Sequence, residues 1–171
     1  MDSTRRVVII GAGPAGAAAA MSLTRFSDLE VLLLDRATFP RQKVCGSGLS
    51  PWALDLLDKM ELGALVRREA FAIGAGRIAG ARGDGVELRS SYHAAVLLRE
   101  RFDALLVEEA VQRGARLQEG TRVDEVQRCN GRVAGVRTSQ GNVEAYPRSA
   151  VAGLAENGAS ADWPFGTTHS R

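Results

Sequence analysis

The stretch from Val7 to Ala20 constrains the fold more than any other part of this 171-residue chain. It reads VVIIGAGPAGAAAA, with four β-branched residues, then glycines at positions 11, 13 and 16, then alanines. β-Branched runs favour a buried strand, glycines a sharp turn, and alanines a helix. The stretch therefore predicts a strand, a turn and a helix in succession, the order that can hold the pyrophosphate of a dinucleotide.

Each residue of the turn has a physical reason to be there. Gly11 permits a sharp turn off the strand, Gly13 lets a phosphate approach the backbone, and Gly16 lets the helix pack tightly. Pro14 suits the first helical position, where its missing N–H is not needed. The free N–H groups of the first helical turn, with the positive end of the helix dipole, then face the phosphate oxygens.

A second apolar run supports this interpretation. Residues 29–34 are apolar apart from Glu30 and end in Asp35, which lies nineteen residues past Gly16. The dinucleotide fingerprint has an acid about twenty residues further on, where its carboxylate accepts hydrogen bonds from a ribose hydroxyl. The alternative is an ordinary α/β turn with a surface aspartate, and the matching order of strands, glycines, helix and acid favours the dinucleotide site.

Composition excludes several classes of function. The net charge of +2 and the absence of a Lys/Arg cluster do not favour nucleic acid binding, and no apolar run is long enough to predict a transmembrane segment. The chain does not open with the order of a signal peptide, so we expect a cytoplasmic protein. Cys45 and Cys129 lie outside any metal-binding pattern, so we expect neither a metal site nor a disulfide framework.

The rest of the chain predicts further elements around a long loop at residues 36–50. We expect, in order, a helix at 51–62 capped by Ser50 and ended by Gly63, a hairpin within 71–89, a strand at 95–98, a helix at 99–113, a hairpin around Asn130-Gly131 and a turn near 140–142. The helix at 99–113 should face Phe102, Leu105, Leu106, Ala110 and Val111 inward. This order predicts an α/β fold, a Rossmann-like βαβ domain with an inserted antiparallel excursion.

The long loop carries a family resemblance. Residues 39–51 read FPRQKVCGSGLSP and resemble the K-x-C-G-G-G-L-S-P stretch of the geranylgeranyl reductase family, a branch of the FAD-dependent enzymes with the para-hydroxybenzoate hydroxylase fold. Residues 99–106 (RERFDALL) resemble that family's R-x-x-F-D-x-x-L helix start, and residues 120–123 (GTRV) its following strand. The resemblance covers about residues 5–145, with three motifs in the expected order.

The resemblance implies a set of FAD contacts. The pyrophosphate would contact Gly11, Gly13, Ala15 and Gly16, at the turn that also holds Pro14. The adenosine ribose would contact Asp35 and Arg36. The isoalloxazine ring would lie close to Cys45 and Gly46, Arg99 would contact the FAD, and the backbone of Val123 would meet the adenine. Ser47 stands where the family most often has glycine, which adds a Cβ and a hydroxyl beside the flavin.

Two of these residues have a competing explanation. Composition alone makes Cys45 a small packing thiol, whereas the family loop around it favours a flavin-proximal, catalytic role without a redox disulfide partner. Arg99 stands at a helix N-terminus, which is unfavourable for a cation, so a phosphate or flavin partner would explain it. The acidic neighbours Glu100 and Asp103 are the alternative partners for Arg99.

The end of the chain departs from the family pattern. Flavoproteins of this fold continue with a strand and a second, G-A-D-G-like phosphate-binding stretch, of which Glu156 to Ser160 is a faint echo. Pro147 is unsuited to a central strand because it cannot donate to the ladder. We therefore predict a partial FAD-binding domain at residues 1–145 and a non-native or disordered tail at residues 146–171, from a truncated or frame-shifted reading frame.

The resemblance implies the FAD-binding portion of a flavin-dependent oxidoreductase that transfers a hydride to the C=C bonds of an isoprenoid, a hydrophobic small molecule. NAD(P)H is a candidate electron donor. One alternative is an FAD-dependent monooxygenase or halogenase, and another is a truncated, catalytically inactive nucleotide-binding fragment. A plain NAD dehydrogenase is disfavoured by the loop and by the motif at Arg99.

Overall fold

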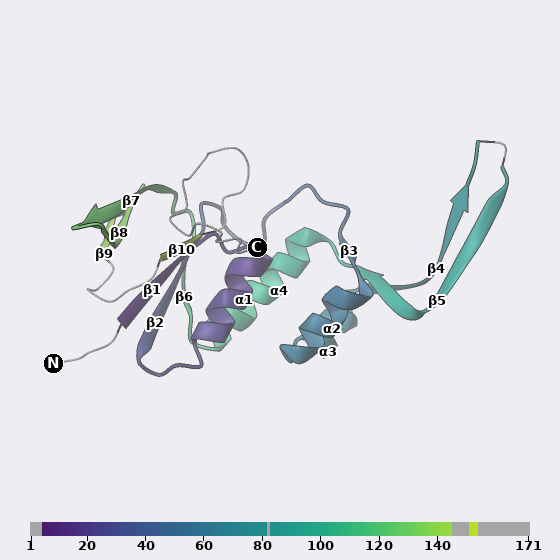
Figure 1. The fold of residues 1–171 in the computed structure, drawn as a ribbon, viewed down its shortest axis with the longest axis horizontal. Coiled ribbons are helices and arrows are strands. Elements are labelled where there is room, and N and C mark those ends of the chain that lie inside the picture. Colours follow the sequence, from purple (N-terminus) through teal and green to yellow (C-terminus); the bar gives the residue numbers. More distant parts are fainter. Residues whose placement is uncertain (1–4, 82, 145–150, 154–171) are drawn as a thin grey trace, which may run out of the picture.

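A four-stranded parallel sheet forms the centre of the computed structural model, which describes residues 5–81, 83–144 and 151–153. Its strands, in the order β10-β1-β2-β6, are β10 (Val151–Gly153), β1 (Arg5–Ile10), β2 (Leu29–Leu34) and β6 (Arg116–Gln118). Helices α1 (Pro14–Leu23) and α4 (Arg99–Gln112) lie side by side against one face of this sheet (Figure 1). The α/β architecture is therefore as the sequence predicts.

A three-stranded antiparallel sheet packs against the other face of the parallel sheet. Its strands are β7 (Val123–Cys129), β8 (Arg132–Thr138) and β9 (Gly141–Glu144). Val136 of β8 is fully buried against Val8 and Leu34, whereas Ile9 and Leu33 point toward the helices. Because side chains alternate along a strand, two buried faces require an apolar residue at nearly every position, which explains the continuous apolar runs of β1 and β2.

Glu30 is the polar exception within β2, and two neighbouring strands neutralise it. Arg6 of β1 donates from Nε to Glu30 at 2.8 Å, and Arg116 of β6 donates from Nη1 at 2.8 Å. The hydrogen bond from Arg6 is the main reason that the pKa of Glu30 is lowered, and burial opposes it. The carboxylate therefore bridges three strands of the parallel sheet.

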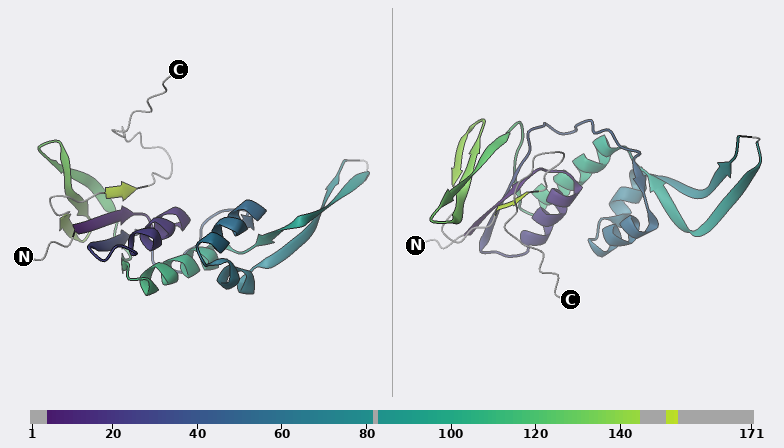
Figure 2. Two further views of the ribbon diagram at one scale, coloured as in Figure 1. Left: turned by 60° about the horizontal axis from the view of Figure 1, so that its bottom comes forward. Right: turned by 45° about the horizontal axis from the view of Figure 1, so that its top comes forward.

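Residues 48–96 form an arm of the molecule, whose helices pack on the same core as α1 and α4. It contains β3 (Gly48–Leu49), α2 (Pro51–Lys59), α3 (Gly63–Glu69), β4 (Phe71–Ala79) and β5 (Gly85–Val96). The three strands pair antiparallel in the order β3-β5-β4, and the β4–β5 hairpin projects away from the rest of the protein (Figures 1 and 2). This arm is the antiparallel excursion that the sequence predicts after the second strand.

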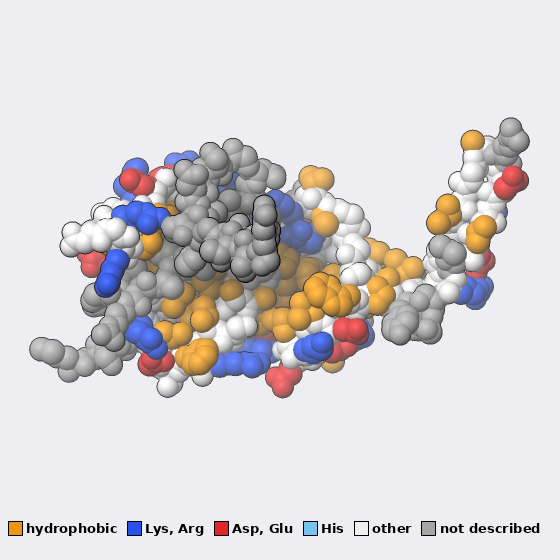
Figure 3. Space-filling model, in the orientation of Figure 1, with side chains coloured by type: hydrophobic (Ala, Val, Ile, Leu, Met, Phe, Trp, Pro, Cys, Tyr) orange, Lys and Arg blue, Asp and Glu red, His pale blue; other side chains and the backbone are white. Residues whose placement is uncertain are grey.

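Apolar side chains are exposed on this arm. Trp52 of α2 and Phe71 of β4 are each 77% exposed, and Ile78 near the tip of the hairpin is 68% exposed. In the space-filling view, hydrophobic side chains gather over the middle of the molecule and continue onto the hairpin (Figure 3).

Two expectations for the arm are wrong in detail. Gly63 does not end the helix at 51–62, because α2 stops at Lys59 and Gly63 begins α3, a helix that the sequence analysis did not predict. Glu61 takes the left-handed conformation, with φ of 64°, and a Cβ on Gly63 would lie 1.7 Å from Asp58 Oδ1. A larger residue at this position would therefore displace the ion pair between Asp58 and Arg67. The expected strand at 95–98 is the end of β5.

Other predicted turns and helix ends agree more closely with the structure. The hairpin turn at Asn130-Gly131 has positive φ at both residues, 51° and 76°, as a tight hairpin requires. Helix α4 ends at Gln112 with Gly114 just beyond it at φ 104°. The prediction that Val111 faces inward is wrong, because its side chain is 44% exposed. Strand β6 was not predicted, because a segment of three residues is too short to show the alternation of a strand.

The predicted tail lies mostly outside the described residues. Val151–Gly153 form β10, which pairs in parallel with β1 so that Gly153 stands beside Ile10. These three residues therefore belong to the central sheet. Residues 145–150 and 154–171, with Pro147 and the echo at 156–160, lie outside the described residues, and for them the tail stays a prediction. No helix of the described part of the chain has the length and apolar character to cross a membrane.

The contact between the two sheets predicts the outcome of one substitution. Val136→Ala removes two buried methyl groups from the small cluster with Val8 and Leu34, so the free energy of unfolding should fall by about 1.5–3 kcal/mol. The matched control is Val126→Ala in the neighbouring strand, where the side chain is 38% exposed and the loss should be smaller. Urea denaturation measures both, and equal losses would contradict this packing.

Candidate functional site

The glycine turn lies at the carboxyl end of β1, where parallel α/β sheets bind their ligands. Gly11 has φ of 96°, and a Cβ on Gly16 would lie 1.9 Å from the carbonyl oxygen of Gly11. Helix α1 starts at Pro14 directly after Gly13, which has no capping side chain. The turn is therefore as tight as the sequence predicts, and the N–H groups that open α1 are not covered by a side-chain cap.

Asp35 is buried at the end of β2 and holds the glycine turn. Its Oδ2 accepts the backbone N–H of Ala12 at 2.7 Å, and its Oδ1 accepts that of Ala37 at 2.9 Å. A carboxylate has about four lone-pair positions, so each oxygen can accept one more bond, such as one from a ribose hydroxyl. The structure thus gives Asp35 a clamping role that the sequence analysis missed, while Arg36 beside it is exposed.

The segment carrying Val123 lies next to Asp35. The backbone N–H of Thr121 donates to the Asp35 carbonyl at 2.8 Å, and Val123 opens β7 two residues later. The side chain of Val123 packs on the cluster around Val8 and Leu34. The glycine turn, Asp35 and the start of β7 therefore lie together at one edge of the parallel sheet.

The loop at residues 36–50 folds back toward the glycine turn and places Arg41 there. A Cβ on Gly13 would lie 3.5 Å from Arg41 Nη2, so the guanidinium stands directly over the turn. The guanidinium carbon also lies 5.2 Å from the centre of the Phe39 ring. Arg41 was not among the predicted site residues, although it lies within the loop motif and a cation is the natural partner of a phosphate.

Asp103 joins Arg41 to Arg99. Arg99 donates two hydrogen bonds to it, Nε to Oδ1 at 2.6 Å and Nη2 to Oδ2 at 2.9 Å. Arg41 Nη2 lies 3.2 Å from the same Oδ2, and the carboxylate is fully buried. Of the two acidic neighbours considered for Arg99, Asp103 is therefore the partner, and the spacing of four residues along a helix was its signal.

Cys45 is exposed, and the pKa of its thiol is lowered. The backbone N–H of Ser47 contributes most to a lowered pKa of the Cys45 thiol, followed by the hydrogen bond from the Arg99 side chain, with a smaller contribution from the N–H of Gly46. Hydrogen bonds to the sulfur favour the thiolate. A chain of contacts thus runs from the glycine turn through Arg41, Asp103 and Arg99 to Cys45.

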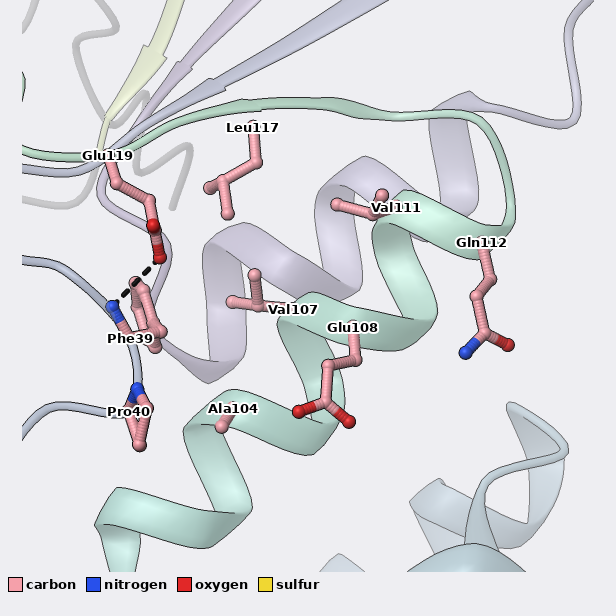
Figure 4. A pocket seen from close by; sticks show the side chains of 9 residues that line it. All are labelled: Phe39, Pro40, Ala104, Val107, Glu108, Val111, Gln112, Leu117 and Glu119. Carbon is pink, nitrogen blue, oxygen red and sulfur yellow. Dashed lines mark hydrogen bonds between the residues drawn. The ribbon is translucent and has the colours of Figure 1, made fainter.

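A shallow groove lies on a different part of the surface. It has a volume of about 390 Å³ and runs between the Phe39-Pro40 pair and the exposed side of α4 (Figure 4). The N–H of Phe39 donates to Glu119 Oε1 at 2.8 Å on one side of it, and Val111 contributes to the apolar lining. None of the candidate site residues lines this groove, so it is not part of the candidate site.

Comparison with known proteins identifies the family of this chain. A family model described as an FAD binding domain matches residues 4–150. The chain belongs to this family. Its fold is that of the FAD-binding domain, and the family is one of FAD-dependent oxidoreductases.

The chain is similar to several individual FAD-dependent proteins. A menaquinone reductase of Mycolicibacterium smegmatis is 34% identical over 148 residues, which cover 83% of this chain and 36% of that protein. A geranylgeranyl bacteriochlorophyll reductase-like structure from Thermoplasma acidophilum has a TM-score of 0.72 at 25% identity, covering 88% of this chain and 38% of that one. The chondrochloren halogenase CndH has a TM-score of 0.75 at 21% identity, covering 91% and 38%. The chain spans little more than a third of the length of these relatives.

Ser47 has a backbone conformation that favours glycine. Ser47 has φ of 57°, in the left-handed region, and its carbonyl accepts the N–H of Leu97 at 3.0 Å. A side chain in that region costs about 1–2 kcal/mol, which is partly offset because glycine loses more freedom on folding. Ser47 therefore adopts a backbone conformation typical of glycine, and this conformation strains the loop.

We expect Ser47→Gly to raise the free energy of unfolding by up to about 1 kcal/mol, because it removes this strain. Asn130→Gly is the matched control, since Asn130 also has a positive φ, 51°, but asparagine tolerates that region better. Its gain should be smaller than that of Ser47→Gly in parallel urea denaturation. A fall in stability for Ser47→Gly would contradict the assignment of strain to this residue.

Proposed function

We propose that this chain is the FAD-binding portion of a flavin-dependent reductase whose substrate is an isoprenoid or an isoprenoid quinone. The observation that carries the proposal is the pair of linked arginines, Arg41 and Arg99, of which Arg41 lies over the glycine turn. Arg41 lies over Gly13, and Asp103 connects it to Arg99 beside Cys45. Anions bind where backbone N–H groups at a helix start and a guanidinium converge, which fits the pyrophosphate of FAD.

The described residues fit FAD along the length of the site. Gly11, Gly13 and Gly16, with the first N–H groups of α1, would hold the pyrophosphate, and Arg41 would neutralise it. The remaining contacts proposed are those of the adenosine ribose with Asp35 and Arg36, of the adenine with the backbone of Val123, and of the flavin ring with Cys45, Gly46 and Arg99. When bound, FAD supplies the hydride chemistry, and the chain holds and orients it.

Two relatives support a reductase and an isoprenoid substrate. One is named a menaquinone reductase, and one solved structure is described as geranylgeranyl bacteriochlorophyll reductase-like. The loop at residues 39–51 resembles the reductases, whereas the likeness to the halogenase supports the fold alone. We therefore propose hydride transfer to an isoprenoid C=C bond in the full-length context, with NAD(P)H as donor and a cytoplasmic location.

The glycine turn offers a test that separates cofactor binding from folding. A Cβ on Gly13 would meet Arg41 Nη2 at 3.5 Å, an ordinary contact, so Gly13→Ala should fold normally. The same methyl group lies where the pyrophosphate approaches the backbone, so the Kd for FAD should rise tenfold or more. Flavin fluorescence titration measures affinity, and circular dichroism checks folding.

Gly76→Ala in β4 is the control, since a Cβ there meets nothing within 4 Å and FAD affinity should be unchanged. Wild-type protein that stays colourless and takes up no added FAD would favour the inactive nucleotide-binding fragment over this proposal. Equal FAD affinity of wild type and Gly13→Ala would contradict the placement of the pyrophosphate.

A further inference from the structure

Asp103 is a buried acid in the first turns of α4, and its environment is unusual for a structural ion pair. It is 0% exposed, and Phe102, Ala104 and Leu105 beside it are all buried apolar residues. A buried carboxylate is costly unless charged donors satisfy it. Both of its oxygens are satisfied, by two arginines that come from different parts of the chain.

The two arginines extend from Asp103 to opposite ends of the candidate site. Arg41 comes from the loop after β2 and reaches the glycine turn at Gly13, and Arg99 comes from the start of α4 and reaches Cys45. Their side chains are only 14% and 19% exposed, so neither moves freely in water. One carboxylate therefore fixes the orientation of both guanidinium groups before any ligand is present.

The charges in this cluster do not cancel. Two guanidinium groups face one carboxylate, so Arg41, Arg99 and Asp103 together carry a net charge of +1. In addition, Arg41 Nε is buried and has no hydrogen-bond partner within the described residues. A buried donor without a partner is unfavourable, and an anion at the glycine turn would lie within the reach of the same guanidinium.

We propose that Asp103 is a positioning residue, which holds Arg41 over the phosphate-binding turn and Arg99 against the Cys45 loop so that both guanidinium groups are preorganised for an anionic dinucleotide. Its action on Arg41 and FAD rests on the proposed function, whereas its action on Arg99 and Cys45 is a property of the protein alone. Fixing the two long side chains in advance removes the ordering cost from the binding step.

The first experiment uses the protein without cofactor. The rate of Cys45 alkylation by iodoacetamide is measured against pH in a Cys129→Ser background, because both thiols are exposed. The groups that act on the Cys45 sulfur are the Arg99 guanidinium and the N–H groups of Ser47 and Gly46. In Asp103→Asn, Arg99 loses its anchor, so the midpoint of the profile should move up toward that of an ordinary thiol, about pH 8.5.

The direction of this shift separates three roles for Asp103. If the residue positions Arg99, its removal raises the midpoint. If it acts only as a nearby negative charge, its removal lowers the midpoint, because a negative charge disfavours a thiolate. If it only packs, the midpoint does not move. The second and third results would each overturn the proposal.

The second experiment measures FAD affinity in the same variants. Asp103→Asn should raise the Kd at least tenfold while the fold is retained, and an unchanged Kd in a wild type that binds FAD would overturn the proposal. If the wild type does not bind FAD, the proposed function fails, but the alkylation profile still tests the link from Asp103 to Arg99. The two failures are therefore distinguishable.

Two further variants keep the experiment decisive. Glu109→Gln removes another ion pair of the same spacing from α4, that with Arg113 at 2.8 Å, and should change neither the profile nor the Kd. Asp103→Glu keeps the charge in case the asparagine variant does not fold. Its longer side chain cannot meet both guanidinium groups as Asp103 does. The alkylation midpoint and the Kd for FAD should therefore both rise, but less than in Asp103→Asn. Wild-type values of both quantities would overturn the proposal.

Discussion

The candidate site depends on the hydrogen bonds of one residue, Asp35, which joins three loops. Its two oxygens accept the N–H groups of Ala12 and Ala37, and its own backbone bonds to Gln118 and Thr121. One residue therefore fixes the turn after β1, the loop after β2 and the connection from β6 to β7. Because Asp35 is 8% exposed, replacing it with an apolar residue would leave the N–H groups of Ala12 and Ala37 without an acceptor.

Local sequence patterns were enough to predict the parts of the fold that are set by backbone conformation. The glycines at 11 and 16 and the Asn130-Gly131 turn follow from sterics within a few residues, so their positions were correct. The α/β order followed from the apolar runs. Short elements such as β6 and α3 were missed because their formation depends on partners distant in the chain, such as the pairing of β6 with β2.

The candidate site was predictable in outline but not in its connections. The motifs pointed to Arg99 and Cys45, and the fold brings Arg99 close enough to lower the pKa of the Cys45 thiol. Arg41 was overlooked because nothing local distinguishes it from the other cations of a polar loop, and only the tertiary structure brings it to Gly13. The buried state of Asp103 likewise requires Arg41 from sixty-two residues earlier, which no helical period can reveal.

The loop motif and the motif at the start of α4 owe their joint occurrence to physical contact. The contacts that attach the loop include those of Phe39 with Glu119, of Arg41 with Asp103 and of Ser47 with Leu97. Leu97 lies just before α4, Asp103 lies within it, and Glu119 follows β6. The two motifs are therefore in direct contact, because Asp103 of α4 holds Arg41 of the loop. This is why the two patterns together identify the family far more specifically than a glycine turn, which any dinucleotide-binding fold can contain.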